Sequence, residues 1–142
     1  MPELVLQTED VAIHYGGVKA LDGVELTLAR GQIRGLIGPN GAGKSTVIDA
    51  ITGRRRLTRG RVRLRGDDVS ALGVVERRQR GLSRSFQRTS VFAQMPVRKQ
   101  VVLASEMAGT ADATADADEV LRELALDGLG GVSAADLGYG EQ

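Results

Sequence analysis

Eight consecutive residues, 38–45, read Gly-Pro-Asn-Gly-Ala-Gly-Lys-Ser and fit the pattern G-x-x-x-x-G-K-[ST]. The mostly apolar segment 33–37 precedes them and predicts a short strand. After them, apolar residues recur at helical spacing, which predicts a helix over 44–52 that ends at Gly53. A strand, a glycine-rich loop and a helix in this order are typical of a phosphate-binding unit. The motif therefore indicates an α/β fold.

The loop contains the residue types that binding a triphosphate requires. Glycines permit positive φ angles and close backbone approach, so that amide N–H groups and the start of the following helix face the phosphate oxygens. Lys44 supplies a mobile positive charge for the β- and γ-phosphates, and the Ser45 hydroxyl is suited to ligate Mg²⁺. An ordinary glycine-rich turn is the alternative, and the strand and helix on both sides of the loop make it the weaker one. The predicted phosphate-binding residues are Gly38, Pro39, Asn40, Gly41, Ala42, Gly43, Lys44, Ser45 and Thr46.

Composition indicates a soluble globular protein, with 42 % hydrophobic and 26 % charged residues. No apolar run approaches the roughly 20 residues needed to cross a bilayer. Residues 1–10 carry acids and lack the basic start of a signal peptide. The sequence contains no cysteine, which fits a reducing compartment. We therefore expect a cytoplasmic protein.

Charge is unevenly distributed along the chain. Twelve arginines lie between Arg54 and Arg88, whereas residues 110–142 hold eight acids and the single base Arg122. A basic segment can bind nucleic acid. In residues 61–65, however, arginines alternate with apolar residues, which is the pattern of a half-buried strand with a solvated face. This interpretation accounts for the charges without a nucleic-acid partner, and we expect none.

Periodicity and turn residues predict the other elements. Further strands are expected at residues 4–13, 24–28 and 61–65, and turns at 16–17 and 22–23. The acidic pair Glu9-Asp10 interrupts the first strand. Residues 82–86 are expected to be extended, and helices are expected at residues 74–80, 97–107 and 116–126. The segment 109–115, rich in Ala, Asp and Thr, is expected to be a flexible connection.

Four features, in a consistent order, resemble the ATP-binding subunits of ABC transporters, and the likeness spans essentially the whole chain. The first is the phosphate loop within residues 35–46. Tyr15, followed by the small apolar Val18, resembles the aromatic residue that stacks on adenine; a capped sheet edge is the alternative. Gln87, in Ser-Phe-Gln, resembles the Q-loop glutamine, which reaches Mg²⁺ and the attacking water; alone it would be an ordinary loop residue. The fourth resembles the LSGGQ-type signature, which contacts ATP on the opposite subunit of a dimer, and comprises Leu137, Gly138, Tyr139, Gly140, Glu141 and Gln142.

This resemblance implies a P-loop NTPase fold of ABC type, with an N-terminal antiparallel β lobe, an incomplete parallel α/β core and a helical subdomain. It implies a nucleotide-binding core over 1–90 and a helical subdomain over 91–142. The implied cofactors are ATP and Mg²⁺, with Lys44 and Gln87 in catalysis and Ser45 and Gln87 at the metal. The implied partners are a second ATP-binding subunit and transmembrane permease subunits, at the inner face of the cell membrane.

One branch of the family is more similar than the others. Residues 81–88, followed by Val91-Phe92 and by Met-Pro-Val at 95–97, resemble the Q-loop region of subunits that serve branched-chain amino-acid importers. Urea and short-amide importers have a similar segment and remain an alternative. In the family this region contacts the membrane subunit, so Phe92 is expected either at that interface or in the core.

The chain departs from the family pattern in two ways. Gly138 stands where the family usually has a serine, and we expect the contact with ATP across the dimer to lose about 1–2 kcal/mol, the worth of one hydrogen bond. The sequence also stops at Gln142, before the Walker B acids and the switch histidine. The expectation is a chain that binds ATP without hydrolysing it. The strand at 33–37 would then expose an apolar edge.

Two other functions match parts of the sequence. A GTPase would be consistent with the short D-x-x-G match that starts at Asp127, but no N-K-x-D motif follows it. A non-transport, ABC-type ATPase associated with nucleic acid would use the arginine-rich middle of the chain. The solvated strand face already accounts for these arginines, so this second function is less favoured than transport.

Overall fold

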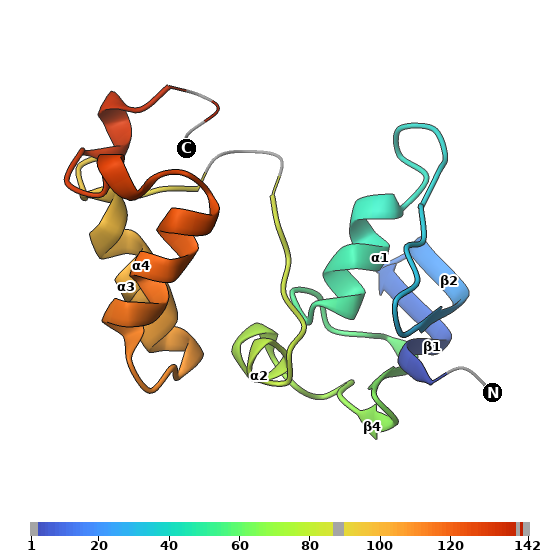
Figure 1. Cartoon of the computed structure of the whole chain (residues 1–142). Coiled ribbons are helices and arrows are strands. Elements are labelled where there is room, and N and C mark those ends of the chain that lie inside the picture. Colours follow the sequence, from blue (N-terminus) through green and yellow to red (C-terminus); the bar gives the residue numbers. More distant parts are fainter. Residues whose placement is uncertain (1–2, 87–89, 139, 141–142) are drawn as a thin grey trace. The chain divides into compact units, whose positions relative to one another are not determined.

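The computed structural model describes residues 3–86, 90–138 and 140. It divides the chain into two compact units, Met1–Arg84 and Ser85–Gln142 (Figure 1). Among the described residues, no helix has the length and apolar character that crossing a bilayer requires.

The first unit contains an antiparallel sheet with the strand order β2-β1-β3-β4. Its strands are β1 (Leu4–Tyr15), β2 (Val18–Ala29), β3 (Arg59–Leu64) and β4 (Asp67–Asp68). Its helices are α1 (Lys44–Ile51) and α2 (Val74–Gln79). The sheet is the antiparallel β lobe that the sequence predicted, and α1 is the predicted helix, which ends before Gly53, where φ is +76°.

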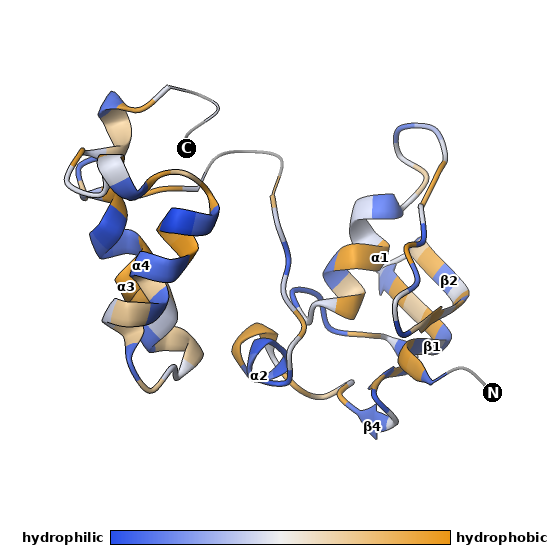
Figure 2. Ribbon diagram, in the orientation of Figure 1, coloured by the Kyte–Doolittle hydropathy of each residue, from blue (hydrophilic) through white to orange (hydrophobic). Residues whose placement is uncertain are grey.

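The core of this unit forms between α1 and the sheet. Val11, Ile13 and Val62 from the strands are almost fully buried, together with Ala50 and Ile51 from α1. Figure 2 shows the hydrophobic residues along α1 and the neighbouring strands. This packing holds α1, and with it the loop at its N-terminus, against the sheet.

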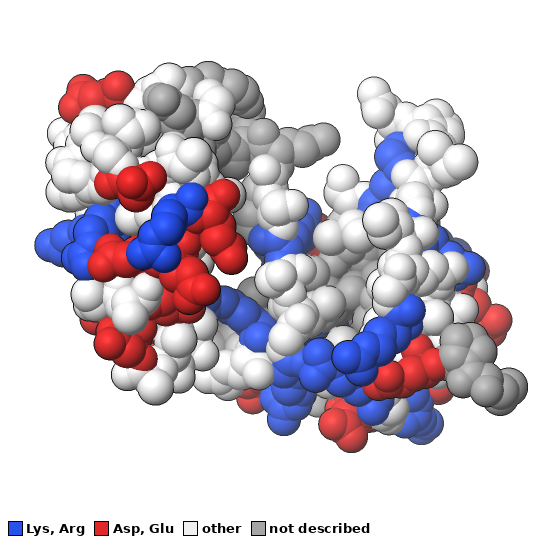
Figure 3. All heavy atoms as spheres, in the orientation of Figure 1, with Lys and Arg blue, Asp and Glu red and all other residues white. Residues whose placement is uncertain are grey.

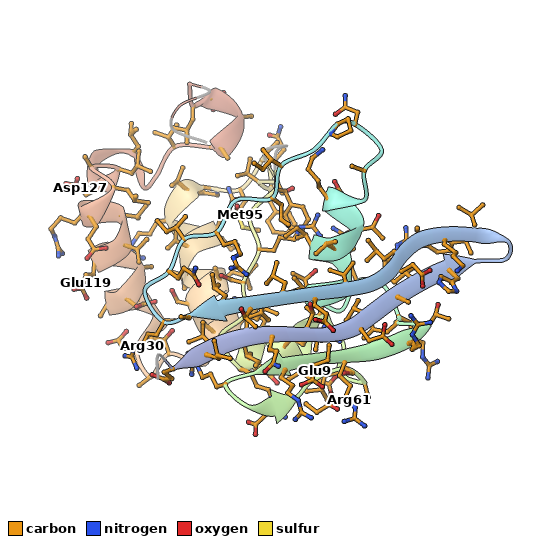
Figure 4. The ribbon with its side chains drawn as sticks, turned by 90° about the vertical axis from the view of Figure 1, so that its right-hand side faces the viewer. Glu9, Arg30, Arg61, Met95, Glu119 and Asp127 are labelled. Carbon is orange, nitrogen blue, oxygen red and sulfur yellow. The ribbon has the colours of Figure 1, made fainter. Side chains whose placement is uncertain are left out.

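The alternating arginines of β3 lie on a solvated face, as predicted. Val62 and Leu64 are buried, whereas Arg61 is exposed. Arg63 Nε lies 2.8 Å from Glu9 Oε1 on β1, and Glu9 and Arg61 are register partners, both labelled in Figure 4. Figure 3 shows acidic and basic side chains interspersed over this part of the surface. Ion pairs with acids therefore account for several of these arginines.

The first strand, β1, runs without a break from Leu4 to Tyr15, so the predicted interruption at Glu9 and Asp10 is wrong. The pair instead makes a bulge, where the register shifts against both neighbouring strands and Asp10 has a positive φ of 47°. Similarly, β2 starts at Val18, and the predicted turn at 22–23 is an irregularity inside it, with φ of +75° at Gly23. Both distortions keep the strands paired and bend them.

Residues 33–37 do not form the predicted strand. Ile33 and Ile37 are each 98 % exposed, and no described strand pairs with this segment. A strand is stable only when neighbours satisfy its backbone groups, and local apolar character cannot supply them. Arg34 anchors the segment by donating from Nη1 to Thr27 O at 2.6 Å. The predicted apolar strand edge is therefore not formed, and the two isoleucines are exposed in a segment that has no strand pairing among the described residues.

The second unit is helical. It contains α3 (Val97–Ala108), α4 (Ala113–Glu123) and two short 3₁₀ helices, η1 (Asp127–Leu129) and η2 (Ala134–Asp136). Val97, Leu121 and Leu137 form its buried core. Arg98 on α3 donates two hydrogen bonds to the Asp118 carboxylate on α4, at 2.6 and 2.8 Å, and this ion pair joins the two helices.

The predicted flexible connection at 109–115 is wrong over its second half. Asp112 accepts hydrogen bonds from Thr114 N and Ala115 N, at 3.1 and 3.0 Å, and so caps a helix that begins at Ala113. The same helix ends at Glu123, earlier than predicted, and Ala125 has a positive φ of 56°. The low-complexity composition favoured a flexible segment, and the prediction did not recognise Asp112 as a helix-capping residue.

Candidate nucleotide site

The glycine-rich loop joins the exposed segment 33–37 to the N-terminus of α1. Gly41 and Gly43 have φ of 84° and 85°, a region that side chains disfavour. Gly43 is also close to β2, since a Cβ there would lie 3.1 Å from Leu21 Cδ2 and 3.2 Å from Ala20 O. Glycine at 43 thus lets the loop turn directly into the helix while touching the sheet.

The first turn of α1 offers backbone donors. The first hydrogen bond of the helix runs from Val47 N to Gly43 O at 2.9 Å, so the amides of Lys44, Ser45 and Thr46 have no partner inside the helix. Gly43 has no side chain with which to cap them. Aligned N–H groups and the positive end of the helix dipole favour an anion at this place.

Lys44 brings a positive charge to the same place. Its Nζ donates to Gly38 O and Pro39 O, at 2.6 and 2.7 Å. An ammonium group has three donors, so one remains for a phosphate oxygen. The Ser45 side chain is exposed next to it and provides a hydroxyl oxygen of the kind that Mg²⁺ prefers. The loop therefore fits a magnesium-bound polyphosphate.

Tyr15 lies at the end of β1, where the chain turns into β2. Its ring is 49 % exposed, and Val18, its register partner, is 65 % exposed. The guanidinium carbon of Arg55 lies 5.9 Å from the centre of the ring, a cation–π distance. Arg55 follows α1 in the chain. The half-exposed ring thus has a cation over it that the sequence pattern did not identify.

A charged network fixes the hairpin that carries Tyr15. Arg59 donates to both oxygens of Asp10, at 2.6 and 2.9 Å, and to Asp22 at 3.4 Å, while Lys19 binds Asp22 at 2.8 Å. The hydrogen bond from Arg59 lowers the pKa of Asp10, and the one from Lys19 lowers the pKa of Asp22. Both carboxylates are therefore ionised at neutral pH and link β1, β2 and β3.

Comparison with known proteins identifies the family. The family model described as ABC transporter matches residues 21–142. The chain belongs to the ABC transporter family.

The ABC transporter proteins similar to this chain differ in what their names say they transport. The chain is 37 % identical over 102 residues to the galactofuranose transporter ATP-binding protein of Escherichia coli, covering 72 % of the chain and 20 % of that protein. It is 33 % identical over 104 residues to the high-affinity branched-chain amino acid transport ATP-binding protein of Pseudomonas aeruginosa, covering 73 % and 41 %. It is 36 % identical over 140 residues to the methionine import ATP-binding protein of Caulobacter vibrioides, covering 94 % and 42 %. The chain thus spans 20–42 % of the length of these relatives.

Solved structures of ABC transporter cassettes share the fold. One, in its ADP conformation, matches with a TM-score of 0.86 and 29 % identity, over 97 % of this chain and 60 % of that one. Another, free of nucleotide, matches with a TM-score of 0.82 and 28 % identity, over 95 % and 59 %. The predicted P-loop fold of ABC type is confirmed.

The structure describes only some residues of the Q-loop and signature motifs. Gln87 lies outside the described residues, as do Tyr139, Glu141 and Gln142. Leu137 is 9 % exposed and packs in the core of the second unit with Val97 and Leu121, so its first role is structural. The roles predicted for the signature and for Gln87 stay predictions.

Phe92, for which two environments were predicted, does not pack in the core. Its side chain is 62 % exposed and lines a groove of about 460 Å³. The groove is lined by Phe92, Ala93, Gln94, Met95, Pro96 and Lys99. The interface role that the ABC resemblance implies for Phe92 stays a prediction.

Proposed function

We propose that this chain is part of the ATP-binding subunit of an ABC importer, which couples binding and hydrolysis of MgATP to transport. The observation that carries the proposal is the phosphate loop, where the open amides of Lys44, Ser45 and Thr46 and the Lys44 ammonium meet. The relatives named above as transport and import ATP-binding proteins support the proposal.

Each residue of the loop has a defined task in this proposal. The amides and Lys44 bind the β- and γ-phosphates and offset the negative charge that builds up on the transferred group. Ser45 and Gln87 would hold Mg²⁺, which would supply positive charge to the phosphates. Gln87 also orients the attacking water. Charge-assisted hydrogen bonds contribute about 1.5–3 kcal/mol each, so we expect several together to give affinity on the order of micromolar after association costs.

Tyr15 provides the adenine contact in this proposal. Base–aromatic stacking contributes about 1–3 kcal/mol, so Tyr15→Ala is expected to weaken MgATP binding about tenfold. Tyr15→Phe retains the ring and is expected to bind nearly as well as the wild type. Calorimetry with MgATP and with magnesium tripolyphosphate, which has no base, measures the effect. Equal weakening for both ligands, or no weakening for MgATP, would contradict stacking at Tyr15.

The proposed partners follow from the same function. A second ATP-binding subunit would contribute its signature to the ATP bound here, and the segment of residues 137–142 would contact the ATP of that subunit. Membrane permease subunits would bind the helical part of the chain, near Phe92. This assignment places the protein on the cytoplasmic face of the membrane, with a nucleotide-binding core over 1–90 and a helical subdomain over 91–142.

We propose branched-chain amino acids as the cargo. The segment 81–97 resembles that of branched-chain importer subunits, and one relative above carries this function in its name. Deleting the gene in its native cell is expected to abolish high-affinity uptake of radiolabelled leucine and to leave methionine and galactose uptake unchanged. Undiminished leucine uptake would contradict the assignment, and loss of urea uptake in its place would identify the urea-importer alternative.

A further inference from the structure

Arg77 is buried on a helix whose other residues are exposed. Its side chain is the largest of those fully buried, at 1 % exposure, while its neighbours Glu76 and Arg78 are exposed. The guanidinium donates to four backbone carbonyls: Ala50 O at 2.8 Å, Ile51 O at 2.6 Å, Leu72 O at 2.9 Å and Ser70 O at 2.9 Å. Burial lowers the pKa of Arg77, against the opposing effect of the Asp68 charge. A buried cation that is held by four backbone carbonyls is a specific arrangement.

Two of these acceptors are the last carbonyls of α1. Ala50 and Ile51 close the helix whose first residue is Lys44. The four final carbonyls of a helix lack partners within it, and a cation beside them complements the negative end of the dipole. With eight residues, α1 is about 12 Å long. The Arg77 guanidinium therefore binds the C-terminus of a short helix whose N-terminus follows the phosphate loop.

A third acceptor, Ser70 O, connects Arg77 to the sheet. The Ser70 hydroxyl accepts from Val62 N on β3 at 2.9 Å, and Val69 N donates to Val62 O at 2.9 Å. Through Ser70, therefore, one side chain joins the end of α1 to the central part of the sheet. Gly53 is required beside it, because a Cβ at that position would lie 3.0 Å from Arg77 Nε, and its φ of +76° also disfavours a side chain.

We propose that Arg77 is a positioning residue for nucleotide binding, which fixes α1 from its C-terminus so that its N-terminal amides and Lys44 converge on the phosphates. The inference rests on the proposed function. It makes phosphate affinity, rather than base affinity, depend on a side chain at the opposite end of the helix. If misalignment of α1 removes the equivalent of one charge-assisted hydrogen bond to the phosphates, MgATP binding weakens about tenfold.

The test compares Arg77→Met, Arg77→Lys and the control Arg78→Met, which removes the same charge from an exposed position on the same helix. Calorimetry measures the dissociation constants of MgATP and of adenosine for each full chain, and urea unfolding monitors the fold. We expect Arg77→Met to weaken MgATP about tenfold and adenosine less than twofold. Arg77→Lys, which keeps a cation with fewer donors, is expected to lose about threefold, and Arg78→Met nothing.

The outcomes separate the inference from the proposed function. If the wild-type chain does not bind MgATP, the proposed function itself is wrong. If it binds and the folded Arg77 variants bind MgATP equally well, the positioning role is refuted. Equal weakening for MgATP and adenosine refutes it too, because a general structural defect acts on both. If Arg77→Met does not fold, Arg77→Lys decides by the same two criteria.

Discussion

Lys44→Ala is expected to weaken MgATP binding by about two orders of magnitude. The ammonium group would form charge-assisted hydrogen bonds with oxygens of two phosphates, each contributing about 1.5–3 kcal/mol, and a loss of about 3 kcal/mol corresponds to more than a hundredfold in affinity. In the structure, Nζ already lies at the loop, 2.6 Å from Gly38 O and 2.7 Å from Pro39 O. Competition against a fluorescent ATP analogue measures the affinity.

Lys99→Ala is the matched control for this prediction. It removes the same charge from an exposed position on α3 in the second unit and should leave the affinity within a factor of about two. The urea midpoint of Lys44→Ala should stay near that of the wild type, because its two hydrogen bonds are exposed to solvent. Equal affinities of the two lysine variants would show that the phosphates bind elsewhere.

Gly60→Ala is expected to destabilise the first unit by about 3–5 kcal/mol. At Gly60, φ is +90°, and a Cβ would lie 2.2 Å from Asp10 O and 2.5 Å from Glu9 O, both backbone atoms. Neither can move without breaking the pairing of β3 with the bulge of β1. The bulge and the glycine thus depend on each other, which accounts for the continuous but bent β1.

Gly66→Ala separates the clash from the backbone strain. Gly66 has nearly the same φ, +89°, but a Cβ there meets nothing within 4 Å. It should cost about 1 kcal/mol, the strain of a positive φ alone. Urea unfolding followed by circular dichroism compares the two variants. A difference of less than about 1 kcal/mol between them would contradict the close packing of Gly60 on β1.

Local patterns predicted the parts of the fold that depend on neighbours close in sequence. Alternation in residues 61–65 placed Val62 inside and the arginines outside, because the period of a strand fixes which face each residue occupies. Helical spacing and a following glycine located α1 and α2 in the same way. The strand predicted at residues 33–37 was wrong. A strand needs a partner to pair with, and the local sequence does not specify that partner.

The candidate site was predictable in its loop and not in its surroundings. The motif at 38–45 named the loop, since phosphate binding demands glycines and a lysine at fixed spacing. Arg55 beside Tyr15 and Arg77 beneath α1 depend on contacts between distant segments. Arg77 also lies in a highly charged helix, where the sequence indicates solvent exposure, so no local signal marks it as buried. Its four carbonyl acceptors are the tertiary feature that overrides that preference.

The most direct measurement is a calorimetric titration of the folded chain with MgATP. The structure predicts saturable heat from a single class of sites, because the phosphate loop is formed at the start of α1 with its amides open. Absence of binding heat across a range of temperatures, from a chain that unfolds cooperatively in urea, would contradict the assignment of a nucleotide site to residues 38–46.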